Sequence, residues 1–184
     1  MSIFSKFKSR YTSAQLMLDA NQAHDQGDYQ RAANLLEEML RIDPTRTEAL
    51  TNLGNAYEKL NRLDEAEKAH RDCLASRPNN HLAWTNLGVV YERQGKEDAA
   101  MECYLKATEV NPSFWGAWMK LGLAYRKQQD HQQAVVSFKH AIAANAGNWR
   151  LWALISEDYE KLGENRLAQE ALIKANSLKN TGRA

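Results

Sequence analysis

The feature that most constrains the fold of this chain is a sequence period of 34 residues. Pro44, Pro78 and Pro112 keep this interval. So do four positions in each successive segment, which are Leu50, Leu53, Gly54 and Tyr57, then Trp84, Leu87, Gly88 and Tyr91, then Trp118, Leu121, Gly122 and Tyr125, and last Trp152, Ile155, Ser156 and Tyr159. A fixed period of this length indicates an array of small units that bury their apolar faces against one another.

The residue pattern within each unit of the array predicts a pair of helices. Trp84, Leu87 and Tyr91 lie at helical spacing and give the first helix one apolar face. In the second helix, Ala100 has small equivalents in every other unit, which lets this helix approach Gly88 closely. With only 3 prolines and 9 glycines in 184 residues, the composition favours helix almost throughout and predicts an all-α class.

One equivalent position separates the two helices of each unit. It is occupied by Gly27, Asn61, Gly95, Gln129 and Gly163. Glycine and asparagine adopt the left-handed conformation that ends many helices at low cost. We therefore expect a helix to end at this position in each unit.

The repeated residues resemble the tetratricopeptide repeat family, whose pattern is W-x2-L-G-x2-Y, then A-x3-F, then P. The resemblance implies a right-handed α-solenoid of five helix-turn-helix repeats, with the first helices lining a concave groove. The repeats would span residues 13–46, 47–80, 81–114, 115–148 and 149–182, with a basic-aromatic segment at 1–12 and a tail at 183–184. The first repeat departs from the pattern at Ala20 and Ala23, as terminal repeats often do.

The resemblance also implies which residues face the groove and could hold a peptide. They are Asn21, Thr51, Asn52, Asn55, Thr85, Asn86, Val89, Lys120, Leu123, Arg126, Lys127 and Arg150. The asparagines are similar to the ladder by which some members of the family hold an extended chain, because an amide both donates to and accepts from a peptide backbone. The alternative is that these amides only face water.

The basic groove residues could form a second feature. Lys120, Arg126, Lys127 and Arg150 would suit a carboxylate, although a scatter of solvated charges explains them too. The carboxylate clamp by which some members of the family capture acidic chain ends is incomplete here in every register, so we do not expect binding of that kind.

Charge and cysteine content exclude several classes of function. The 24 basic and 23 acidic residues leave a net charge of +1, which disfavours a generic nucleic-acid binder. No apolar run approaches the ~20 residues of a membrane span, and the start of the chain lacks a secretory core. Cys73 and Cys103 offer neither a disulfide framework nor a zinc site. We therefore expect a soluble, cytoplasmic protein with reduced, buried thiols.

No catalytic, cofactor or metal motif is present among the histidines, glycines and acidic pairs, so the chain is not expected to be an enzyme. The leading hypothesis is an adaptor that holds an extended or helical segment of a protein partner in the groove. The alternative is a structural protein that self-associates through the ends and convex surface of the array. Residues 1–12 could cap the first hairpin, remain a tail, drive homo-oligomerisation or touch an anionic membrane.

Overall fold

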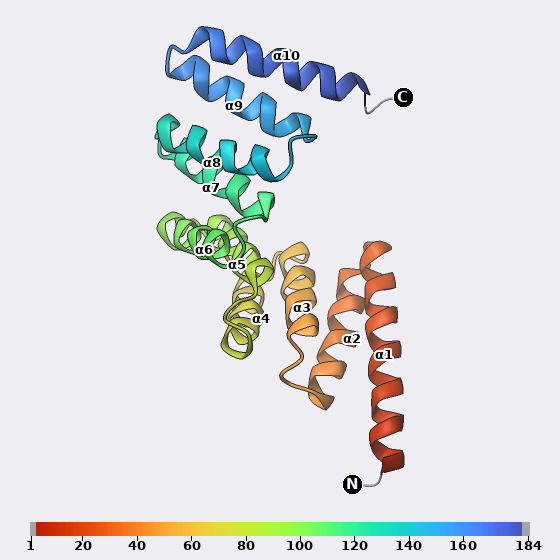
Figure 1. Ribbon diagram of the computed structural model, residues 1–184. Coiled ribbons are helices and arrows are strands. Elements are labelled where there is room, and N and C mark those ends of the chain that lie inside the picture. The colour runs from red at the N-terminus through yellow and green to blue at the C-terminus, as the bar shows by residue number, and fades with distance from the viewer. Residues whose placement is uncertain (1–2, 182–184) are drawn as a thin grey trace. The chain divides into compact units, whose positions relative to one another are not determined.

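The computed structural model describes the backbone of residues 3–181 and the side chains of residues 13–181 (Figure 1). Over residues 3–181 the chain forms ten α-helices and no strand, which confirms the all-α class. The chain divides into two compact units, Met1–Lys96 and Glu97–Ala184. None of the helices in the described range has the length and apolarity that crossing a bilayer requires.

The unit Met1–Lys96 contains the helices α1 (Ile3–Asp25), α2 (Tyr29–Ile42), α3 (Thr47–Lys59), α4 (Leu63–Ser76) and α5 (His81–Arg93). Each helix packs on the next one along the chain, and α3 also contacts α5. Small residues lie where the helices cross, since Ala32, Ala49 and Ala66 are completely buried. Larger side chains such as Leu36 and Met39 fill the space between the crossings. Consecutive helices therefore pack against one another throughout this unit.

The unit Glu97–Ala184 contains α6 (Glu97–Val110), α7 (Trp115–Lys127), α8 (His131–Ala144), α9 (Trp149–Lys161) and α10 (Asn165–Thr181). The helices again pack in chain order. Phe138 and Ile155 are buried at the centre of this core, together with Ala134 and Ala171. This unit repeats the hairpin arrangement of the first one with bulkier aromatic residues.

The turn prediction is confirmed at all five positions. Gly27, Gly95 and Gly163 have φ angles of 78°, 75° and 76°, and the non-glycine residues Asn61 and Gln129 have φ angles of 60° and 64°. The amide that follows each of these residues bonds back into the preceding helix, as Arg62 N does to Tyr57 O at 2.9 Å. A left-handed residue therefore ends the first helix of every hairpin.

The glycines that recur with the 34-residue period, such as Gly54 and Gly122, contact a larger side chain than the alanine expected from the sequence. A Cβ atom added to Gly54 would lie 2.4 Å from the His70 ring, and one added to Gly122 would lie 2.6 Å from the Phe138 ring. These rings come from the second helix, four residues beyond the small residue of the pattern. Glycine is therefore required in α3 and α7 because a ring lies flat against the backbone there.

The tryptophans of the repeat join each helix to the loop before it. The indole Nε1 atoms of Trp84, Trp118 and Trp152 donate to the carbonyl oxygens of Pro78, Pro112 and Ala146 at 2.7, 2.8 and 2.8 Å. Each acceptor lies six residues upstream. The periodic tryptophan thus satisfies a loop carbonyl as well as adding apolar contact area.

Helix α1 is longer than the other first helices of the hairpins, because it begins at Ile3 and has 23 residues whereas α3 has 13. The backbone of residues 3–12 is therefore continuous with the first helix. The side chains of residues 1–12 and the tail at 183–184 lie outside the described part, so the predicted roles of these two segments stay predictions.

Candidate functional site

The predicted groove asparagines of the unit Met1–Lys96 form two hydrogen-bonded pairs. Asn52 Nδ2 on α3 donates to Asn21 Oδ1 on α1 at 3.2 Å, and Asn86 Nδ2 on α5 donates to Asn55 Oδ1 on α3 at 2.8 Å. We call these two contacts the amide pairs. Each pair joins neighbouring first helices and leaves one NH2 group and one carbonyl oxygen with hydrogen-bonding capacity for a ligand.

The amide pairs follow a rule of the repeat. The ninth position of one repeat, held by Asn21 or Asn55, meets the sixth position of the next, held by Asn52 or Asn86. In the unit Glu97–Ala184 the corresponding positions carry Leu123 and Leu154, which are partly buried against the core of that unit. Both amide pairs thus lie in the unit Met1–Lys96.

Two predicted groove residues prove to be part of the packed interior. Thr51 and Thr85 are buried, and each hydroxyl donates to the carbonyl oxygen four residues earlier, Thr47 O and His81 O, at 2.8 Å. Thr51 Oγ1 also lies 3.3 Å from the Cys73 sulfur. These hydroxyls are satisfied within their own helices, so we withdraw both threonines from the candidate site.

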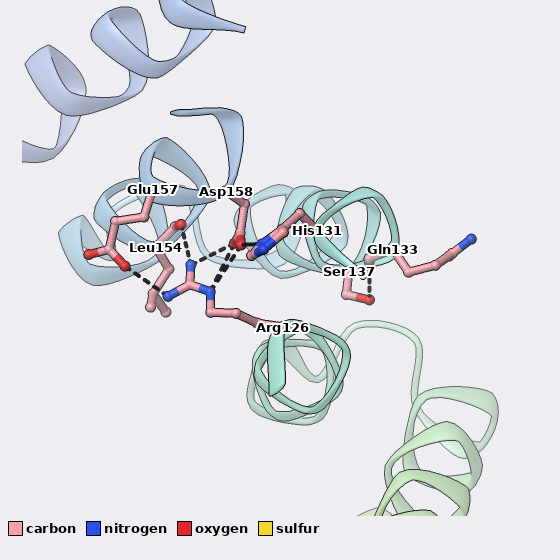
Figure 2. Close-up of polar contacts among 7 residues, drawn as sticks. All are labelled: Arg126, His131, Gln133, Ser137, Leu154, Glu157 and Asp158. Carbon is pink, nitrogen blue, oxygen red and sulfur yellow. Dashed lines mark hydrogen bonds and ion pairs between the residues drawn. The ribbon is translucent and has the colours of Figure 1, made fainter. Parts of the chain in front are cut away.

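Arg126 was expected to offer its charge to a ligand, but the structure shows it fully engaged (Figure 2). Its Nη2 atom donates to Asp158 Oδ2 at 2.6 Å and to Leu154 O at 2.5 Å, and its Nη1 atom donates to Glu157 Oε2 at 2.8 Å. The guanidinium also lies 5.3 Å from the centre of the Phe138 ring. Arg126 therefore joins α7 to α9 and is withdrawn as a ligand-binding residue.

The other members of the predicted basic patch are dispersed. Lys127 forms an ion pair of 2.7 Å with Glu97. Arg150 is exposed at the start of α9, where its guanidinium lies 5.3 Å from the Trp149 ring. Lys120 and Val89 are half-buried on α7 and α5. Within residues 13–181, Arg126 and Lys127 of this patch thus bind carboxylates of the chain itself.

Sequence reasoning missed Asp158 and His131, which complete the contacts of Arg126. Asp158 is 1% exposed and accepts hydrogen bonds from Arg126 and from His131 Nδ1, the latter at 2.8 Å. The repeat itself carried a signal for this cluster. Asp158 stands where earlier repeats have Ala56, Val90 and Ala124, and Arg126 stands where they have Glu58 and Glu92. Two simultaneous departures from the pattern indicate a compensating pair.

A hollow of about 320 Å³ lies beside the first amide pair. We call it the amide hollow, and it is lined by Ala20, Asn21, His24, Asp25, Ala32, Leu36, Asn52 and Asn55. The His24 ring is held at its rim by an edge-to-face contact with Tyr29 at 5.2 Å. Among residues 13–181, no group of three or more histidine, cysteine, aspartate or glutamate side chains is arranged to hold a metal ion.

Comparison with known proteins gives two family matches. The model for the middle TPR-like domain of cilia and flagella-associated protein 70 matches residues 50–179, and a tetratricopeptide-repeat model matches residues 23–70. No curated protein matches the chain.

Several solved structures share the fold. The Pseudomonas aeruginosa pilF structure has a TM-score of 0.84 at 19% identity, covering 92% of this chain and 78% of that one. MamA from Desulfovibrio magneticus RS-1 has a TM-score of 0.80 at 18% identity, covering 94% and 98%. The MamA AMB-1 structure has a TM-score of 0.73 at 27% identity, covering 95% and 93%. These likenesses agree with the helical repeats in both units.

Proposed function

Because the chain belongs to the tetratricopeptide-repeat family, we propose that it is a non-catalytic interaction scaffold that holds an extended segment of another protein. The observation that carries this proposal is the two amide pairs of the unit Met1–Lys96. Each pair offers a donor and an acceptor, which is what a peptide bond requires for its own carbonyl and N–H. Recognition would therefore depend on the backbone of the segment more than on its side chains.

The pairs also suit the dimensions of an extended chain. Packed helices lie roughly 10 Å apart, and an extended chain advances about 3.4 Å per residue. One step from the Asn21–Asn52 pair to the Asn55–Asn86 pair therefore corresponds to about three residues of the guest. The pairing fixes the side-chain amides beforehand, which lowers the entropy lost on binding.

The test begins with peptides selected from a displayed random library against the whole chain. Their affinity is then measured for the Asn52→Ala/Asn86→Ala variant, which should bind at least about tenfold more weakly because the variant cannot form either amide pair or the hydrogen bonds of these two side chains to the peptide backbone. The matched control is Asn34→Ala/Asn176→Ala, which removes two exposed asparagines from α2 and α10 and should bind as the unaltered chain does. Equal affinity of all three proteins would overturn the proposal.

A second measurement addresses backbone recognition directly. Replacing single N–H groups of a selected peptide by N-methyl groups should weaken binding at positions about three residues apart. Loss at every position, or at none, would contradict recognition by the amide pairs.

A second candidate function is structural self-assembly, and one observation favours it. Leu172 and Ile173 on α10 are 45% and 63% exposed, so two large apolar side chains lie open on the last helix of the unit Glu97–Ala184. Neighbouring exposed apolar residues are a common feature of association surfaces.

A further inference from the structure

The amide hollow has a chemistry of its own beyond the backbone recognition proposed above. Its lining includes the apolar side chains of Ala20, Ala32 and Leu36, all almost completely buried. Its polar lining includes Asn52 and Asn55 from α3 and Asp25 at the end of α1. Apolar side chains beside a few polar groups are usual in a ligand pocket, and about 320 Å³ lies within the range of such pockets.

Hydrogen bonding within the polar lining leaves acceptors available. Asn52 Nδ2 donates a hydrogen bond to Asn21 Oδ1, and the same nitrogen lies 3.7 Å from the sulfur of Met17. The Asn52 carbonyl oxygen therefore keeps its acceptor capacity. The Asp25 carboxylate, whose side chain is 84% exposed, lies 3.9 Å from the His24 ring nitrogen, which is beyond hydrogen-bonding distance.

The charge of the hollow distinguishes it from its neighbours. Its lining contains the Asp25 carboxylate and no lysine or arginine. Two other hollows of the same unit carry charges of both signs, Glu48 with Arg77 in one, and Glu37, Glu65 and Asp72 with Arg41 and Lys68 in the other. In addition, α1 ends at Asp25, and the carboxyl end of a helix carries a partial negative charge.

We propose that the amide hollow is a specificity pocket for a cationic side chain, arginine or lysine, of the segment held by the amide pairs. The aliphatic stem lies beside Ala20 and Leu36 of the lining, while the charged head reaches the Asp25 carboxylate and the Asn52 carbonyl oxygen. Long basic side chains divide their contacts in this way between apolar surface and polar rim. Arginine fits better than lysine because its planar fork can bond both acceptors at once. This inference rests on the proposed function, since it assigns one residue of the guest.

The first test uses a small probe and does not require a known partner. Acetyl-arginine amide is titrated into the whole chain while the side-chain amide signals of Asn21, Asn52 and Asn55 are followed by NMR. We expect saturable shifts of these signals, and none with acetyl-citrulline amide, which has the same shape without the charge. Equal shifts with both probes, or none with acetyl-arginine amide, would overturn the proposal.

Two variants make the test specific to the Asp25 carboxylate. Asp25→Asn should weaken binding of acetyl-arginine amide about tenfold, because it removes a charge-assisted hydrogen bond. Asp19→Asn removes another carboxylate from α1 outside the lining of the hollow and should leave binding unchanged. Identical binding by both variants would contradict the assignment of Asp25.

The inference and the proposed function can fail separately. Suppose that a selected peptide binds the Asn52→Ala/Asn86→Ala variant more weakly, yet binds the unaltered chain equally well with citrulline in place of each arginine and norleucine in place of each lysine. This result would overturn the proposed pocket for a cationic side chain and would support binding by the amide pairs. Peptides whose affinity is unchanged by the asparagine substitutions would overturn the proposal of binding by the amide pairs, whatever the charge of the peptides.

Discussion

His70 is a single residue with a measurable consequence for stability. It occupies the position held by Leu36, Tyr104 and Phe138 in other repeats, and its ring is completely buried against Gly54. Neither ring nitrogen has a hydrogen-bond partner within the described chain. Burial lowers the pKa of His70 from 6.5 to about 4, because the charged imidazolium cannot be solvated there.

The lowered pKa of His70 predicts acid sensitivity. Below pH 6.5 His70 is protonated in the unfolded chain, whereas in the folded protein it becomes protonated only near pH 4. The unfolded state therefore binds more protons between these pH values. The free energy of unfolding should fall as the pH is lowered from 6.5 towards 4, by about 3 kcal/mol in total. Denaturant unfolding at pH 7 and pH 4.5 measures this loss.

His70→Leu is the matched variant for that experiment, since leucine occupies the equivalent position in the first repeat. The variant should lose clearly less stability between pH 7 and pH 4.5 than the unaltered chain does. His81, whose pKa is also lowered by burial, is present in both proteins and cancels in the comparison. An identical pH dependence of the two proteins would show that His70 is not the responsible group.

Gln129 carries a local strain that the glycines at its equivalent positions avoid. It has a φ of 64°, which costs a residue with a β-carbon roughly 1 kcal/mol. Gln129→Gly should therefore raise the free energy of unfolding by about 1 kcal/mol. The preceding residue provides the control, because Gln128 has a φ of −80° and Gln128→Gly should lower stability. Thermal unfolding that ranks these two variants the other way would contradict the argument.

At the scale of helices, α7 and α9 are joined by the cluster of Arg126, His131 and Asp158 (Figure 2). Asp158 is almost completely buried, so its charge is stable there only because two partners bond it. Removing one side chain of the Arg126–Asp158 ion pair should lower the free energy of unfolding by more than the ion pair contributes, because the remaining charge loses its oppositely charged partner.

The cluster predicts a strongly non-additive double-mutant cycle. Asp158→Ala, which restores the alanine of other repeats, should destabilise the protein by about 3 kcal/mol because Arg126 loses its buried carboxylate partner and keeps only Glu157 and the Leu154 carbonyl oxygen. Adding Arg126→Leu should recover more than half of that loss, since no buried charge then remains. Urea unfolding of the two single variants and the double variant measures the coupling. Additive losses in the double variant would mean that the two side chains do not depend on each other.

At the scale of the whole molecule, the open question is whether copies of the chain associate. The exposed Leu172 and Ile173 of α10 predict that the average mass rises with concentration. Leu172→Ser/Ile173→Ser should abolish that rise in light scattering without altering the helical circular dichroism. The control is Leu18→Ser, which removes from α1 a leucine about as exposed as Ile173. A mass that is constant in the unaltered chain would exclude assembly through α10, whereas binding of selected peptides would be unaffected.

The candidate site was predictable only in part. Asn21, Asn52, Asn55 and Asn86 were expected in the groove because they match the groove positions of the tetratricopeptide repeat family that the sequence resembles. Their mutual pairing across helices was not predicted. The contact between Arg126 and Asp158 was not predicted, since Asp158 lies 32 residues away and looks like an ordinary acidic residue of an exposed helix in the sequence.

What the sequence alone determined is the local structure: the period, the helix pairs and the left-handed residue that ends each first helix. These depend on the spacing of apolar residues and on backbone preferences, which act within a few residues. Tertiary structure decided which polar side chains are engaged within the chain, as with buried Thr51 and half-buried Arg126. The physical reason is that a hydrogen bond needs two atoms about 3 Å apart, and only helix packing sets that distance.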